Sequence, residues 1–105
     1  MTKVRINPGV CGLVTTVEVS GDSGRKLTIK AESLCENVKK MINVLGDTFD
    51  GYKLCSNKPG SGPLYEYASQ NFPAHSGCIS ISGVLKAVEA ECKIALKKDA
   101  SVTFE

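Results

Sequence analysis

The chain has 105 residues with a formal net charge of +2 at pH 7; 42% of its residues are hydrophobic and 23% are charged. This length and composition predict one globular domain over residues 1–105 and exclude a disordered chain. With no Trp, six other aromatic residues and scattered basic residues, the chain lacks the stacking surface of nucleic-acid binders, so we expect no nucleic-acid partner.

Three strands are predicted in the first third of the chain. Residues 3–6 alternate charged and apolar side chains before Asn7-Pro8-Gly9 ends the pattern. Residues 13–19 and 26–31 also alternate, and the turn cluster 20–24 joins them as a hairpin. The inward side chains of these two strands are expected to be Leu13, Thr15, Val17, Val19, Leu27, Ile29 and Ala31.

The next segment, residues 34–45, changes to a helical period. Ser33 and Glu36 form the pattern of a capping box, and Gly46 is placed to end the helix. The stripe expected to face the core is Leu34, Val38, Met41, Ile42 and Leu45.

The second half predicts a loop, two helices and a strand. Residues 46–63 form a long loop rich in Gly, Asp, Asn, Ser and Pro, and a short helix follows at 63–69 with Pro63 at its first position. A long helix is expected at 80–97, begun by Ser80 or Ser82. Its apolar face is Val84, Leu85, Val88, Cys92, Ala95 and Leu96. Residues 100–104 alternate again and predict a last strand with Val102 and Phe104 inward.

This order, β-β-β-α-α-α-β, predicts an α+β fold. We expect a mostly antiparallel sheet of about four strands, with two long helices and one short helix packed on one face. The place of the last strand in the sheet does not follow from the sequence. The sequence also leaves the oligomeric state open, a homodimer included.

Five cysteines are the most suggestive feature of the composition. Their number is odd, no CxxC pair occurs, and the N-terminus lacks the apolar segment of a secretory signal. No apolar run approaches the roughly 20 residues that span a bilayer. We therefore expect free or metal-bound thiols in a cytoplasmic protein with no membrane partner.

Each cysteine has a structural interpretation beside a functional one. Cys92 continues an apolar helix face and is expected in the core, and Cys55 is expected to have no role. Cys11 lies between Gly9 and Gly12, which suit either an ion-binding nest or a tight turn.

Cys35 opens a helix, where N–H groups stabilise a thiolate, although a buried filler residue is equally consistent with that position. His75 and Cys78 stand three residues apart in a turn, and His75 is the only histidine of the chain. A surface histidine is the alternative there.

Three hypotheses about function follow. The first is a metal-binding protein in which Cys11, Cys35, Cys78 and His75 hold zinc or an iron–sulfur cluster. The second is a sulfur carrier or redox protein with Cys78 as nucleophile and Cys35 or Cys11 as resolving thiol. The third is a scaffold domain with structural cysteines that binds an unknown protein or small molecule. No GxxxxGK[ST], GxSxG or HExxH motif is present, so no catalytic residue is assigned.

Several motifs resemble a family of small uncharacterised cysteine-containing proteins of anaerobic bacteria and methanogenic archaea. They are Asn7-Pro8-Gly9-Val10-Cys11-Gly12, Cys35 before the first helix, His75-Ser-Gly-Cys78, and Val84-Leu85-Lys86-Ala87 in the last helix. The likeness spans nearly the whole chain and implies no known activity. It marks Cys11, Cys35, His75 and Cys78 as the residues of interest.

A second likeness is to small sulfur-carrier proteins, whose active cysteine opens a helix in a Cys-Pro-x-Pro motif. The matching stretch here is Cys78-Ile79-Ser80-Ile81, in which both prolines are missing. What this resemblance implies is a thiol just before a helix that can carry a persulfide.

Overall fold

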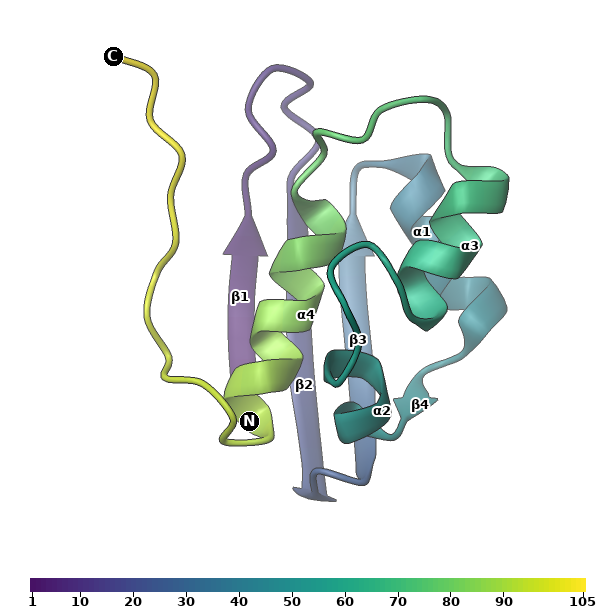
Figure 1. Cartoon of the computed structure of the whole chain (residues 1–105), viewed down its shortest axis with the longest axis vertical. Coiled ribbons are helices and arrows are strands. Elements are labelled where there is room, and N and C mark those ends of the chain that lie inside the picture. The colour runs from purple at the N-terminus through teal and green to yellow at the C-terminus, as the bar shows by residue number, and fades with distance from the viewer.

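The structure, a computed structural model, describes residues 1–105 and contains an antiparallel four-stranded sheet and four helices, which confirms the α+β class (Figure 1). The strands are β1 (Thr2–Ile6), β2 (Thr15–Ser23), β3 (Lys26–Ser33) and β4 (Thr48–Phe49). The helices are α1 (Glu36–Leu45), α2 (Gly51–Cys55), α3 (Pro63–Asn71) and α4 (Ser80–Glu91). None of the helices combines the length and the apolar content that crossing a membrane requires.

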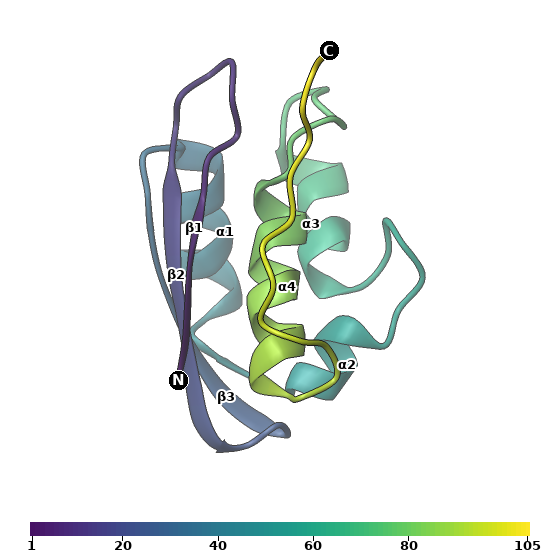
Figure 2. The same cartoon turned by 90° about the vertical axis from the view of Figure 1, so that its left-hand side faces the viewer.

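The sheet has the order β1-β2-β3-β4, so β1 is one of its two edge strands. The helices lie on one face of the sheet (Figure 2). Side chains alternate across β1, β2 and β3 as the sequence predicts: the row Val4–Val17–Ala31 faces the helices, and the row Lys3–Glu18–Lys30 faces solvent.

The core is one cluster of 15 buried apolar side chains between the sheet and the helices. Val17, Val19, Leu27 and Ile29 of the sheet pack against two helical faces. Those faces are Val38, Met41 and Ile42 of α1 and Ile81, Val84, Ala87 and Val88 of α4. At Gly83 an added Cβ would collide with the side chain of Ile6, so the glycine permits α4 to approach β1 closely.

The predicted strand at residues 100–104 is wrong, because these residues form no strand and are exposed. The fourth strand is β4, which lies inside the predicted loop 46–63 together with α2. β4 forms beside β3, and the Asp47 carbonyl accepts the Ile29 N–H at 2.8 Å. The Asp50 carboxylate then accepts the N–H groups of Tyr52 and Lys53, which starts α2. The observed order is therefore β-β-β-α-β-α-α-α.

The predicted ends of the two long helices also need correction. α4 ends at Glu91 and not at residue 97, because Lys93 adopts φ 61° and the Ile94 N–H turns back to the Glu89 carbonyl. Ala95 and Leu96 consequently lie outside the core. The side chain of Leu34 is exposed because α1 begins only at Glu36.

The predicted capping box at α1 does not form: Cys35 is the N-cap residue and makes no side-chain cap. Leu13 is also exposed, since β2 begins after it at Thr15. The rest of the predicted α1 stripe, Val38, Met41, Ile42 and Leu45, is confirmed. Gly46 as the end of α1, with φ 89°, and Pro63 at the start of α3 are also confirmed.

Candidate functional site

Two of the five cysteines pack in or against the core. Cys92 is buried in the core, as predicted, and its thiol donates to the Gly24 carbonyl at 3.8 Å. The Cys55 thiol donates to the Leu85 carbonyl at 3.8 Å. Burial raises the pKa of Cys92, and burial together with the nearby Glu89 carboxylate raises the pKa of Cys55 to about 12. Both thiols stay protonated near neutral pH and are poor nucleophiles.

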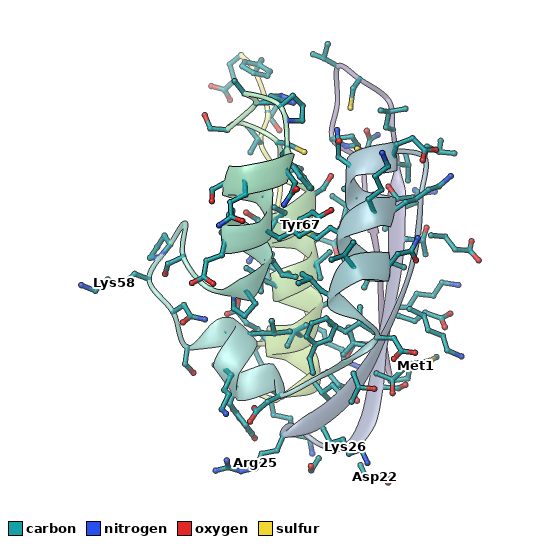
Figure 3. The ribbon with its side chains drawn as sticks, turned by 90° about the vertical axis from the view of Figure 1, so that its right-hand side faces the viewer. Met1, Asp22, Arg25, Lys26, Lys58 and Tyr67 are labelled. Carbon is teal, nitrogen blue, oxygen red and sulfur yellow. The ribbon has the colours of Figure 1, made fainter.

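The other three cysteines lie in segments at the same end of the molecule. Cys11 lies in the loop between β1 and β2, Cys35 in the turn before α1, and both His75 and Cys78 in the loop between α3 and α4. Figures 1 and 2 show all three segments at the top of the molecule. We call the end of the molecule that carries these four residues the thiol end. The opposite end is charged, with Asp22, Arg25 and Lys26 on the β2–β3 hairpin (Figure 3).

Two of these segments are fixed to each other by buried hydrogen bonds. The hydroxyls of Thr15 and Ser33 lie 2.6 Å apart, and Ser33 Oγ also accepts the Cys35 N–H at 3.0 Å. The Leu34 N–H donates to the Val14 carbonyl at 3.1 Å. The turn that holds Cys35 is therefore tied to the strand that follows the Cys11 loop.

The loop that holds Cys11 is a tight turn. Gly9 and Gly12 both have positive φ, 91° and 66°, which explains the glycines on either side of this cysteine. The Asn7 side chain accepts the Gly9 N–H at 3.0 Å, and the Gly12 N–H donates to the Gly9 carbonyl at 2.9 Å. The thiol of Cys11 is exposed at the tip of this loop.

The third segment places Cys78 just before α4. Its thiol is half-buried and donates to the hydroxyl of Ser80 at 3.4 Å, and Ser80 itself is only 2% exposed. The Cys78 N–H donates to the His75 carbonyl at 3.4 Å, so the turn brings the two backbones together. The His75 side chain is exposed.

Although the segments lie at the same end, their side chains do not form a ligand set. No group of three or more His, Cys, Asp or Glu side chains is arranged to hold a metal ion. What the thiol end does contain is the amino-terminal ends of two helices, α1 and α4 (Figure 1). The first helical turns leave N–H groups without intrahelical acceptors, so each of these helix ends carries a partial positive charge.

Sequence reasoning missed an apolar rim around these thiols. Each cysteine of the thiol end has an exposed apolar neighbour in the chain: Val10 beside Cys11, Leu34 beside Cys35, and Ile79 beside Cys78. The sequence pattern assigned Leu34 to the core, because the helix was predicted to begin two residues too early. The available signal was an apolar residue next to a cysteine at the border of a periodic segment.

Comparison with known proteins identifies one family. A family of unknown function, DUF6951, matches residues 2–104. The chain belongs to this family. The match confirms that the chain is a member of an uncharacterised family over nearly its whole length, as the sequence motifs suggested. No curated protein and no solved structure matches the chain. Membership in DUF6951 brings no activity, so the function is argued from the thiol end.

Proposed function

We propose that the protein carries sulfur on Cys78, with Cys35 or Cys11 as the resolving thiol. The observation that supports this proposal is the division of the cysteines. Cys92 is buried and Cys55 is half-buried against the core, and burial raises the pKa of both thiols, whereas the other three cysteines lie at the end where α1 and α4 begin. Positive helix ends are a common means of activating a thiol.

The chemistry is persulfide exchange. The Cys78 thiolate attacks the outer sulfur of a persulfide on a donor protein or small thiol; the S–S bond of the donor breaks, and the donor leaves as a thiolate. A second thiolate, from Cys35 or Cys11, can then attack Cys78 Sγ, which releases hydrosulfide and leaves a disulfide. The hydroxyl of Ser80, which accepts from the thiol, can turn its proton toward the thiolate and stabilise it.

Alkylation followed by mass spectrometry tests the proposal. Cys78 is expected to react fastest, and Cys55 and Cys92 are expected to stay unmodified in the folded protein. Incubation with a low-molecular-weight persulfide donor should add one sulfur atom to Cys78. The variant Ser80→Ala should slow the reaction of Cys78 and leave that of Cys11 unchanged. Equal, slow labelling of all five cysteines would refute a sulfur-carrier function.

A second candidate is a soft-metal site formed by Cys11, Cys35, Cys78 and His75. It is favoured by the position of three donor-bearing segments at one end, and it requires the loops of Cys11 and Cys78 to close around the ion. Three thiolates and an imidazole suit zinc, and three thiolates with a further ligand suit an iron–sulfur cluster. The anaerobic habitat implied by the sequence resemblance would keep such thiols reduced.

Metal analysis and an absorption spectrum of protein purified without oxygen separate the two candidates. A metal site predicts about one bound zinc or a visible cluster band, lost in Cys35→Ser and retained in the control Cys55→Ser. Metal-free, colourless and folded protein contradicts the metal site and leaves the sulfur carrier. If the variants Cys11→Ser, Cys35→Ser and Cys78→Ser change only the stability of the fold, the scaffold interpretation holds.

A further inference from the structure

The segment after α4 leaves the fold as an extended tail. The Ile94 and Ala95 N–H groups both turn back to the Glu89 carbonyl, and the chain then runs beside the helix layer toward the thiol end (Figure 2). Val102 is 77% exposed and Phe104 is 96% exposed. Two large apolar side chains are therefore left in water, where burial against a partner would be favourable.

The tail has the pattern of a strand without a partner. Val102 and Phe104 alternate with Ser101, Thr103 and Glu105, which is the period of a strand with one apolar face. Yet no backbone hydrogen bond between main-chain groups involves residues 99–105. The residues are suited to β structure, but they pair with no strand of their own chain.

An unpaired strand edge exists in the same molecule. β1 is an edge of the sheet and is hydrogen-bonded to β2 alone. It is five residues long, and its side chains Lys3 and Arg5 point to the open face of the sheet. Lys3 pairs with Glu18 at 3.6 Å, whereas Arg5 forms no ion pair. Such an edge is a template for strand addition.

We propose that residues 100–104 of one copy add to β1 of a second copy, and that the exchange is reciprocal. With Val102 and Phe104 on the helix side, paired with Val4 and Ile6, Thr103 stands opposite Arg5, and Glu105 falls on the open face diagonal to Arg5, within reach of its long side chain. The charges match, since the segment 99–105 carries Asp99 and Glu105 and no cation, while β1 carries two cations and no anion. The partner is thus a second copy of this chain.

The tail does not satisfy its own β1. Lys97 Nζ donates to the Met1 carbonyl at 3.3 Å, which anchors the base of the tail near the start of β1. Beyond that point, Figure 2 shows the tail at the level of α4 and not in the plane of the sheet. Each copy therefore has both a free strand and a free edge, and a two-fold pair satisfies both at once.

The test uses the full chain and two charge reversals, Arg5→Glu and Glu105→Arg. Molar mass from light scattering after gel filtration should show a dimer for the native chain at micromolar concentration. In a dimer of either variant alone, residues 5 and 105 carry like charges at both tail–edge contacts. Each of these dimers should therefore weaken by about tenfold or more. Mixing the two variants should restore a dimer, because each tail then meets an edge of opposite charge.

Mixing the two variants restores the charge match only if the tail of one copy pairs with β1 of another. If each tail paired with β1 of its own chain, mixing would restore nothing. A third variant, Phe104→Ser, should also weaken the dimer, and Leu96→Ser is its matched control, since Leu96 is equally exposed but lies outside the proposed strand. Unchanged circular dichroism in all variants shows that the fold is intact. A native chain that stays monomeric, or single variants that dimerise like it, would overturn the proposal.

Discussion

The buried hydroxyl pair Thr15–Ser33 gives the sharpest stability prediction. Ser33 Oγ serves two partners, the hydroxyl of Thr15 at 2.6 Å and the N–H of Cys35 at 3.0 Å. Thr15 is fully buried and Ser33 is 6% exposed, so water replaces neither partner readily. Ser33→Ala removes both hydrogen bonds and leaves the Thr15 hydroxyl buried without a partner.

The expected loss for Ser33→Ala is about 2–3 kcal/mol, because an unsatisfied buried group costs roughly 1–3 kcal/mol and the Cys35 N–H also loses its acceptor. Thr15→Val is nearly isosteric and leaves Ser33 bonded to Cys35, so about 1 kcal/mol or less is expected. The double variant has no orphaned hydroxyl. It should therefore be more stable than Ser33→Ala alone by about 1 kcal/mol.

Urea unfolding of the four proteins measures these differences, provided that the m-value stays constant. Ser69→Ala is the matched control, because that serine is exposed on α3 and its loss should stay within about 0.5 kcal/mol. Additive losses, with the double variant the least stable, would refute the shared role of Ser33. They would also remove the argument that this pair fixes the Cys35 turn to the sheet.

Three further outcomes follow from the structure. The pKa of Cys55 is raised from 9.0 to about 12, so the stability that comes from keeping this thiol protonated is complete below pH 9 and is lost as the pH rises toward 12. The unfolding free energy should therefore fall more steeply between pH 8 and pH 10.5 in the native protein than in Cys55→Ala. The Thr2 hydroxyl and then the amino group of Met1 lower the pKa of Glu91 below 4.5. The native protein should therefore be more stable than Glu91→Gln by about 1 kcal/mol or less near neutral pH. Unfolding measured at decreasing pH should show this difference vanish as the pH falls below 4.5. Gly51→Ala places a Cβ against Cys92, Leu27 and the Gly24 carbonyl, and thermal unfolding should show a loss of about 1–3 kcal/mol; an unchanged midpoint would contradict the close packing of α2 on the sheet.

The candidate site was only partly predictable. The sequence marked Cys11, Cys35, His75 and Cys78 because of their residue types and their place at element borders. That their segments lie at one end follows from the strand directions, which no local pattern contains. Neither the packing of the half-buried Cys55 against the core nor the exposed apolar residues beside the other thiols could be read from spacing, since burial depends on residues far away in the chain.

The sequence by itself determined the three-stranded meander, the apolar stripe of α1, the start of α3 at Pro63 and the burial of Cys92. These features depend on period, turn residues and caps, which act over a few neighbouring residues. The tertiary structure alone decided that residues 48–49 become a strand and residues 100–104 do not. Both segments are short, and strand formation requires a free edge in the right place, so the position of β3 and the path of the chain after α4 decided the outcome.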